Sequence, residues 1–420
     1  MKITILGLGY VGLPLAHAFS EKYKVVGFDI NQTRIDELNN GFDRTLELDN
    51  NQIKKSLQNG MKFTCNIEDI KECTIYIVTV PTPIDGNNEP DLTPIIKSTE
   101  TVGKVLKKGD IVIYESTVYP GVTEDVCVPI LEENSGLIFN KTFFCGYSPE
   151  RINPGDKEHT VTKILKITSG STPEVAKKID ELYKSIIIAG TYLAPTIKVA
   201  EAAKVIENTQ RDVNIALINE LSMIFDLMGI NTNDVINAAS TKWNFIKLTP
   251  GLVGGHCIGV DPYYLTYKAQ SLGYLPSLIL GARQINNNMS KYIADKAIKY
   301  MVKNDKKLKN ANVLIMGITF KENCPDIRNS KVFDIIKELQ EYECNVEVYD
   351  YWVDKSGTDL TYLNFLEKLP LNSQKYDSII VAVGHDEFKK ITDGEYTSMS
   401  KGLPVIIDVK GIVKNPTWKL

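Results

Sequence analysis

The chain has 420 residues and nearly balanced charge, with 48 Lys and Arg, 52 Asp and Glu, and a formal net charge of −4. This length predicts two or three domains, and no Lys/Arg cluster indicates a nucleic-acid-binding face. No apolar run reaches the roughly 18 residues of a membrane span, and the N-terminus has a strand pattern rather than a signal peptide. The seven cysteines are scattered, which argues against a disulfide framework and a zinc site. We therefore expect a cytoplasmic protein.

A glycine motif near the N-terminus predicts a dinucleotide-binding fold. An apolar run at 2–6 leads into Gly7, Gly9 and Gly12, a helical pattern follows, and the next strand pattern ends at Asp29. In this context, G-x-G-x-x-G is the dinucleotide fingerprint. The glycines admit the pyrophosphate, whose charge meets the helix N-terminus. Asp29 would bind the adenosine ribose and repel a 2′-phosphate, so the sequence favours NAD over NADP.

Loops after later strands carry further candidate ligand contacts. Strands are predicted at 74–80, 111–115 and 142–145, and ligands of open α/β sheets lie beyond the carboxyl ends of the strands. Ordinary turn chemistry is the alternative for each polar residue there. The candidates are Pro81, Thr82, Ser116, Thr117 and Glu150.

A helical pattern from about Lys198 to Met228 is unusually long for a globular domain. Such a helix often forms the spine between two domains, and its apolar stripe is a candidate dimer interface. A polar stripe on the same helix includes Lys204 and Asn208, one turn apart. This pair can donate to an oxyanion; a solvated helix face is the alternative.

A glycine-rich segment at 251–264 holds Cys257 among four glycines, with Asp261 four residues later. Glycine allows the backbone to approach a ligand closely, so Cys257 is a candidate nucleophile. A buried small hydrophobe is the alternative. His256 is adjacent, but neighbouring residues of an extended loop point to opposite sides. We therefore assign His256 to structure or substrate contact.

Residues 310–420 repeat the α/β pattern and predict a second domain. Only Gly317 stands where the first domain has three glycines, which argues against a second dinucleotide and leaves room for a mononucleotide. The following loop carries Lys321 and Arg328 as candidate phosphate contacts. Exposed loop charges are the alternative for both.

These motifs together resemble the nucleotide-sugar dehydrogenase family, which includes the UDP-glucose 6-dehydrogenases, over essentially the whole chain. The resemblance implies an α/β protein with two Rossmann-like domains joined by a long central helix that forms a homodimer. It implies an NAD-binding domain at 1–196, a central helical dimerisation domain with the cysteine loop at 197–300, and a UDP-binding domain at 301–420. The residues that carry the resemblance are Gly7–Gly12, Val80–Pro83, Ser116–Val118, Ser148–Glu150, Lys204, Asn208, Gly254–Cys257, Asp261, Phe320, Lys321 and Asp326–Arg328.

Within the family, residues 242–245 and 250–264 are most similar to the UDP-N-acetylglucosamine/UDP-N-acetylgalactosamine type. UDP-glucose enzymes carry other residues after the cysteine. UDP-N-acetylmannosamine enzymes usually place an arginine near the position that Trp243 occupies here. Lys242, Lys247 or aromatic packing by Trp243 would then replace that arginine. UDP-N-acetylmannosamine and UDP-glucose stay as alternative substrates.

The reaction implied by the resemblance oxidises the sugar C6 alcohol to a carboxylate with two NAD in sequence, for surface polysaccharide synthesis. Cys257 would hold the substrate as a thiohemiacetal and then as a thioester. Lys204 and Asn208 would stabilise oxyanions, with Lys204 also a candidate for removing the alcohol proton. The candidates for general-base work and thioester hydrolysis are Asp261 with Thr117, and Glu150.

The resemblance also implies binding residues, and the residue pattern indicates no metal site. The NAD contacts are Gly7, Gly9, Tyr10, Val11, Gly12, Asp29, Arg34, Pro81, Thr82, Ser116, Thr117 and Arg328. The UDP-sugar contacts are Glu150, Arg151, Lys204, Asn208, Leu248, Gly251, Gly254, Phe320 and Lys321. Arg283 is a further candidate. Two other classes stay open: a non-catalytic NAD- or nucleotide-sensing protein, and a two-electron hydroxy-acid dehydrogenase, which would leave the cysteine loop unexplained.

Overall fold

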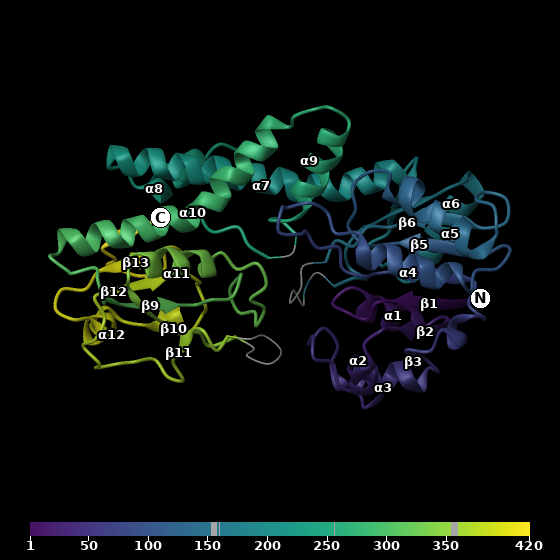
Figure 1. Ribbon diagram of the computed structural model, residues 1–420, viewed down its shortest axis with the longest axis horizontal. Helices are drawn as coiled ribbons and strands as arrows, with labels where there is room; N and C mark the ends of the chain where they lie inside the picture. Colours follow the sequence, from purple (N-terminus) through teal and green to yellow (C-terminus); the bar gives the residue numbers. More distant parts are fainter. Residues whose placement is uncertain (153–157, 159, 256, 354–359) are drawn as a thin grey trace. The chain divides into compact units, whose positions relative to one another are not determined.

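The computed structural model describes residues 1–152, 158, 160–255, 257–353 and 360–420. The chain divides into two compact units. We call them the N-terminal unit (Met1–Glu207 with Tyr263–Leu275) and the C-terminal unit (Asn208–Pro262 with Pro276–Leu420). Figure 1 shows one β-sheet in each unit, with helices packed around it. Among the described residues, no helix combines the length and the apolar character that crossing a bilayer requires.

The N-terminal unit is built on an eight-stranded sheet. Its strands are β1 (Lys2–Leu6), β2 (Lys24–Phe28), β3 (Lys62–Thr64), β4 (Ile75–Val78), β5 (Ile111–Tyr114), β6 (Phe144–Tyr147), β7 (Lys166–Gly170) and β8 (Thr191–Leu193). They follow the order β3-β2-β1-β4-β5-β6-β7-β8, and β6 and β7 are an antiparallel pair in an otherwise parallel sheet. The central strands are almost entirely apolar and buried, as expected for parallel strands covered on both faces.

Helices alternate with these strands, and several begin at a side-chain cap. Asn31 caps the helix at 32–39, and Asp49 and Gln52 form a capping box at the start of the helix at 50–58. The helices are α1 (Gly12–Ser20), α2 (Gln32–Asn39), α3 (Asn50–Gln58), α4 (Thr93–Gly103), α5 (Val128–Ser135) and α6 (Pro173–Lys184), with shorter helices η1 (Ile67–Ile70) and η2 (Val122–Cys127).

The strand expected at 142–145 instead begins at Phe144. Residues before it form a turn, in which Thr142 N donates to Ile138 O at 2.8 Å. The turn delays the start of β6, so its last residue lies two positions beyond the expected end.

The C-terminal unit holds a six-stranded parallel sheet. Its strands are β9 (Asn312–Met316), β10 (Asn345–Tyr349), β11 (Asn364–Phe365), β12 (Ser378–Val381), β13 (Ile406–Asp408) and β14 (Trp418–Lys419). Its helices are α8 (Thr232–Ala239), α10 (Ser277–Lys303), α11 (Val332–Glu341), α12 (Asp393–Met399) and the short η3 (Phe388–Lys390). The strands follow the order β11-β10-β9-β12-β13-β14.

Two apolar cores lie on opposite faces of this second sheet. Successive side chains of a strand point to opposite faces, so β9 contributes Val313 and Ile315 to one core and Leu314 and Met316 to the other. The first core also takes side chains from α10 and α11, and the second takes side chains from α12. Figure 1 shows α10 and α12 on different sides of the sheet.

Two helices contribute residues to both units: α7 (Ile197–Met228) and α9 (Asp261–Ser271). Helix α7 has 32 residues, which corresponds to a length of about 48 Å at 1.5 Å per residue. The α/β class, the two Rossmann-like domains and the long central helix expected from the sequence are confirmed, and both sheets are parallel apart from the β6–β7 pair.

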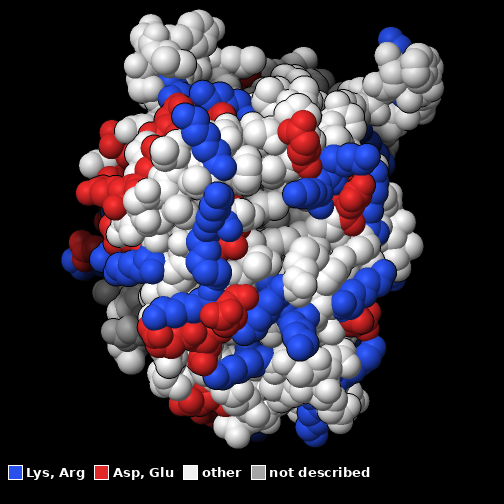
Figure 2. Space-filling view, turned by 90° about the vertical axis from the view of Figure 1, so that its right-hand side faces the viewer, with Lys and Arg blue, Asp and Glu red and all other residues white. Residues whose placement is uncertain are grey.

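Charges of both signs mix on the surface that Figure 2 displays. Lys and Arg side chains are numerous there, and Asp and Glu side chains lie among them.

Candidate active site

The first β-α turn of the N-terminal unit fits a dinucleotide pyrophosphate. Gly7 has a φ of 93°, and a Cβ at Gly12 would lie 1.8 Å from Gly7 O, so both positions need glycine. A Cβ at Gly9 would meet no described atom within 4 Å. Helix α1 begins here without a side-chain cap from the described residues, which leaves its first amides, after Tyr10 and Val11, for an anion.

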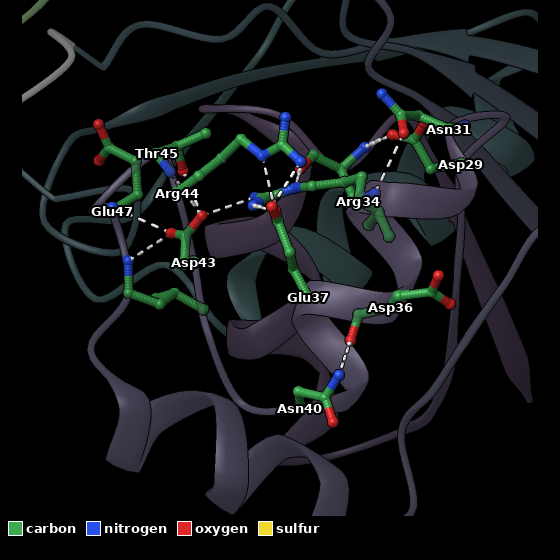
Figure 3. A network of polar contacts seen from close by, with 12 residues as sticks. Asp29, Asn31, Arg34, Asp36, Glu37, Asn40, Asp43, Arg44, Thr45 and Glu47 are labelled. Carbon is green, nitrogen blue, oxygen red and sulfur yellow. Dashed lines mark hydrogen bonds and ion pairs between the residues drawn. The ribbon is translucent and has the colours of Figure 1, made fainter. Parts of the chain in front are cut away.

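Asp29 is held in place at the end of β2, as Figure 3 shows. Its Oδ2 accepts Leu8 N at 2.8 Å, and its Oδ1 accepts Asn31 N at 2.9 Å. Each carboxylate oxygen has a second lone pair, so the fixed carboxylate can still accept the hydroxyls of a ribose. This geometry fits the adenosine end of NAD.

Arg34 lies in the same network and is almost completely buried (5 % exposed). Its Nε donates to Leu8 O at 2.9 Å, and its Nη2 donates to Asp43 Oδ1 at 2.7 Å. Its Nη1 has no hydrogen-bond partner among the described residues, and Glu37 Oε2 lies 3.9 Å away. A buried donor without a hydrogen-bond partner fits a polar group supplied by a ligand.

Asp43 anchors this arginine as a charged group. Burial alone would raise the pKa of Asp43. Hydrogen bonds from Thr45 and Leu48, together with the positive charge of Arg34, outweigh burial and lower that pKa. The arginine is therefore committed to a protein carboxylate, which agrees with a site for NAD rather than NADP.

The loops after β4 and β5 are tied together. Ser116 Oγ donates to Val80 O at 2.6 Å, and Tyr147 OH donates to Ser116 O at 3.1 Å. From α9, Tyr264 OH donates to Pro83 O at 3.0 Å. These bonds hold the expected cofactor-side residues at the carboxyl ends of the strands, where ligands of such sheets bind. Pro81 is exposed, and Thr82 and Thr117 are half-buried.

A buried charge cluster includes Glu150. Lys166 Nζ lies 2.6 Å from Glu115 Oε2 and 3.0 Å from Glu150 Oε2. Glu150 Oε1 also accepts the backbone N–H groups of Arg151 (2.6 Å) and Ile152 (2.7 Å). Burial raises the pKa of Glu115 to about 7, even though Lys166 opposes this shift. The cluster fixes both oxygens of Glu150.

Helix α7 buries two charged side chains that lie one turn apart. Glu201 is completely buried and accepts Gly121 N at 2.6 Å and Thr123 N at 3.0 Å. Burial raises the pKa of Glu201 to about 7. Lys204, one turn along the helix, is 6 % exposed. A solvated helix face therefore does not describe these two residues.

In the C-terminal unit, three expected catalytic residues are linked. Asn208 Nδ2 donates to Asp261 Oδ2 at 2.5 Å. Cys257 O accepts Val260 N at 3.0 Å and Asp261 N at 2.8 Å, in the turn that leads into α9. Cys257 is partly exposed. By contrast, burial raises the pKa of the Cys73 thiol to about 11, which suppresses its thiolate.

A small cavity lies beside the cysteine loop in the same unit, and lysines line it. Its residues include Gly254, Phe320, Lys321, Lys331 and Lys410. A Cβ at Gly254 would lie 2.6 Å from the backbone oxygen of residue 329, so the loop needs glycine to approach this segment. Two of the three lysines already pair with carboxylates, Lys410 with Glu322 Oε1 at 2.5 Å and Lys331 with Asp334 Oδ2 at 3.0 Å.

Asp350 follows β10 as Asp29 follows β2, but its carboxylate is bound by groups of the protein itself. Its Oδ2 accepts Ile318 N at 2.7 Å, its Oδ1 accepts Trp352 N at 2.6 Å, and His385 Nε2 lies 3.2 Å from Oδ2. Burial would raise the pKa of Asp350, but the hydrogen bonds from His385 and the backbone outweigh burial and lower it. With a side chain 0 % exposed, Asp350 cannot receive a ribose.

Comparison with known proteins gives a consistent result for all parts of the chain. Residues 1–187, 198–288 and 314–415 match the NAD-binding, central and UDP-binding domains of the UDP-glucose/GDP-mannose dehydrogenase family. The chain belongs to this family. This dehydrogenase is thus an NAD-dependent oxidoreductase with a UDP-binding domain, which confirms the expected family, cofactor and enzyme class.

Individual relatives of this dehydrogenase match over nearly their whole length. A UDP-N-acetyl-D-glucosamine 6-dehydrogenase of Pseudomonas aeruginosa is 57% identical over 98% of this chain and 96% of its own. One from Salmonella typhi is 55% identical, with the same coverage. The solved structure of a UDP-D-ManNAc dehydrogenase from Pyrococcus horikoshii has a TM-score of 0.89 at 32% identity and covers 100% of this chain and 98% of its own.

The remaining expected contacts have varied surroundings in this dehydrogenase. Arg151 Nη2 pairs with Glu207 Oε1 at 2.9 Å. Arg328 pairs with Asp326 at 2.6 Å and has 54% of its side chain exposed. Leu248 is half-buried, and Trp243 is 91 % exposed. His256 lies outside the described residues.

Sequence reasoning missed several polar residues that support the site of this dehydrogenase. One local sequence feature could have indicated Lys166 and Glu115, because each is a charged residue beside or within an apolar strand pattern. His385 had no such signal, because its partners Asp350 and Asn323 are distant in sequence. Asn219, which binds the cysteine loop, was likewise missed.

Proposed function

We propose that this dehydrogenase oxidises the C6 hydroxyl of UDP-N-acetylglucosamine to a carboxylate. The supporting observation is the 57% and 55% identity to two UDP-N-acetyl-D-glucosamine 6-dehydrogenases, against 34% to a UDP-N-acetyl-D-mannosamine dehydrogenase. UDP-N-acetylgalactosamine is the alternative within the same type. UDP-N-acetylmannosamine and UDP-glucose are further alternatives.

The proposed reaction removes four electrons from each sugar. The alcohol, two NAD⁺ and one water give the carboxylate, two NADH and three protons. NAD supplies the hydride acceptor in each of the two oxidations. The protein must therefore bind the sugar, remove protons and keep the aldehyde from leaving between the oxidations.

Cys257 meets the last of these needs. Its thiolate would add to the aldehyde carbon, so that a C–S bond forms while the carbonyl π electrons move to oxygen. Loss of the second hydride from this thiohemiacetal gives a thioester. Water then breaks the C–S bond and releases the thiolate. Covalent catalysis of this kind divides one difficult oxidation into easier steps.

Charged and amide donors would stabilise the oxygens of these species. We assign oxyanion stabilisation to Lys204 and Asn208, and removal of the alcohol proton to Lys204. The bond from Asn208 to Asp261 (2.5 Å) orients the Asp261 carboxylate. Asp261, with Thr117 and a water, is the proposed general base, and Glu150 would activate water for thioester hydrolysis.

The binding residues are assigned to two groups, one for NAD and one for the UDP-sugar. We assign NAD binding to Gly7, Gly9, Tyr10, Val11, Gly12, Asp29, Arg34, Pro81, Thr82, Ser116, Thr117 and Arg328. We assign UDP-sugar binding to Glu150, Arg151, Lys204, Asn208, Leu248, Gly251, Gly254, Phe320 and Lys321. In this proposal residues 1–196 bind NAD, 197–300 carry the dimer interface and the cysteine loop, and 301–420 bind UDP.

We further propose a homodimer formed through α7. Exposed apolar side chains recur along this helix at Ile206 (54 % exposed), Leu217 (53 %) and Leu227 (85 %). Burying such a stripe against a second copy would be favourable at roughly 25 cal/mol per Å² of apolar surface. We place the enzyme in the cytoplasm, because all seven cysteines are free, and we place its product in surface polysaccharide synthesis.

Steady-state assays with a panel of UDP-sugars test the proposal. The expected result is the highest kcat/KM with UDP-N-acetylglucosamine, a preference for NAD over NADP, and two NADH per sugar consumed. Faster turnover of UDP-N-acetylmannosamine or UDP-glucose would contradict the substrate. One NADH per sugar would reject the four-electron route. Binding of NAD and UDP without turnover of any sugar would favour a nucleotide-sensing protein.

A further inference from the structure

The start of the cysteine loop is held by one buried side chain from α7. Asn219 Oδ1 accepts Gly251 N at 2.8 Å, and Asn219 Nδ2 donates to Gly251 O at 3.0 Å. The side-chain amide thus satisfies both backbone groups of a single residue. Asn219 is 0 % exposed, so water does not compete for these bonds.

Asn219 is itself fixed by a polar network that joins α7 to α10. Its Nδ2 also donates to Asn286 Oδ1 at 2.9 Å, and Asn286 Nδ2 donates to Asp212 Oδ1 at 2.7 Å. Arg283 Nη1 pairs with the same Asp212 oxygen at 2.6 Å, and Arg283 Nη2 donates to Asn287 Oδ1 at 2.7 Å. All of these side chains except that of Asn287 are buried. Asn219 therefore has little freedom to rotate or flip.

The same loop is held again just before the cysteine. Asn329 Nδ2 donates to Gly255 O at 3.2 Å. A Cβ at Gly255 would lie 2.9 Å from the Phe320 ring, so the backbone rests against that ring. A Cβ at Gly259 would lie 3.9 Å from Arg283 Nη2. The network that holds Gly251 thus also borders the loop beyond Cys257.

A buried polar network of this kind favours one geometry. Apolar packing tolerates small shifts, whereas a buried amide that loses a partner costs about 1–3 kcal/mol. Catalysis is sensitive to such shifts, because a misplacement of about 1 Å can reduce a rate roughly 100-fold. A nucleophile that must capture an aldehyde before it diffuses away is especially dependent on its position.

We propose that Asn219 is a positioning residue that fixes the cysteine loop and so keeps the aldehyde bound between the two oxidations. This inference rests on the proposed thioester route. Asn219 acts through the Gly251 backbone. Without it, the loop would sample positions in which the thiolate of Cys257 no longer reaches the aldehyde carbon.

The test compares Asn219→Ala and Asn219→Asp with the wild-type full-length protein. The assay counts NADH formed per UDP-sugar consumed, and a carbonyl-trapping reagent detects released aldehyde. Both variants are expected to give fewer than two NADH per sugar, with aldehyde in solution and kcat reduced about tenfold or more. Asn219→Asp keeps the size and the acceptor for Gly251 N but loses the donor to Gly251 O and Asn286 Oδ1.

Ile335→Val is the matched control. Ile335 is buried in the core of the same unit, among residues of α10, α11 and the sheet, and the change removes one methyl group. This variant is expected to melt at a lower temperature yet still give two NADH per sugar. Equal stoichiometry for wild type and both Asn219 variants, with activity lost only in proportion to the folded fraction, would overturn the inference. A wild-type protein that gives one NADH per sugar would instead refute the proposed function.

Discussion

Lys166 Nζ lies 3.0 Å from Glu150 Oε2, and this ion pair is buried at the carboxyl end of β6. The same ammonium group lies 2.6 Å from Glu115 Oε2. Burial tends to lower the pKa of Lys166, but the two carboxylates outweigh it and raise that pKa. The lysine therefore stays charged and keeps two buried negative groups compatible with each other.

Lys166→Met is expected to destabilise the protein by about 3–5 kcal/mol at pH 8, the usual range when one partner of a buried ion pair is removed. The loss should be smaller at pH 6, because Glu115, whose pKa is raised by burial to about 7, can then protonate. Urea unfolding at the two pH values measures both effects. Lys71→Met, which breaks the exposed pair with Glu68, should cost less than about 1 kcal/mol; a similar cost for both variants would contradict the assigned role.

Two glycines of the first turn are predicted to respond differently to alanine. A Cβ at Gly12 would lie 1.8 Å from Gly7 O, so Gly12→Ala should force the backbone apart and cost about 3 kcal/mol or more. Gly9→Ala meets no described atom within 4 Å and should leave the melting temperature nearly unchanged. It should nevertheless raise the KM for NAD about tenfold or more, because its methyl group occupies the space assigned to the pyrophosphate. Unchanged NAD affinity in Gly9→Ala would argue against that assignment.

The glycine turn could be predicted because its geometry is local. Strand, glycines, helix and Asp29 lie within one short segment, and each has a residue type that its backbone position requires. The extent of α7 was expected for the same reason, since its apolar stripe is continuous. The expected start at about Lys198 differs from the observed Ile197 by one residue.

The residues that hold the site residues in place could not be predicted in this way, because no local sequence pattern indicates their partners. Lys166 reaches Glu150 because β7 runs antiparallel to β6, a pairing that no local pattern encodes. Asn219 contacts Gly251, which is 32 positions away. An asparagine on a helix usually indicates a solvated face, so only the tertiary structure identifies its partner.

The buried carboxyl of Glu201 is expected to make the free energy of unfolding depend on pH. Its pKa is raised by burial to about 7, above the ordinary value of 4.5. A group with a raised folded-state pKa contributes stability below its unfolded-state pKa, and that contribution is lost as pH rises through about 7. Glu201→Gln stays neutral at every pH. Its free energy of unfolding, relative to that of wild type, should therefore rise by about 3 kcal/mol between pH 4.5 and pH 8. Urea unfolding across this range checks the sign, and a difference that is constant with pH would show that Glu201 does not titrate in this way.

Cys257→Ser is predicted to stop the reaction after the first oxidation. A serine hydroxyl is a far weaker acid than a thiol and stays protonated at neutral pH, so it should not capture the aldehyde. The variant should form about one NADH per sugar, with aldehyde in place of the uronic acid, as product analysis by mass spectrometry would show. Cys65→Ser changes the other partly exposed thiol and should keep two NADH per sugar. Full conversion to the acid by Cys257→Ser would exclude the thioester route, because no sulfur would then be available at the position where the aldehyde has to be held.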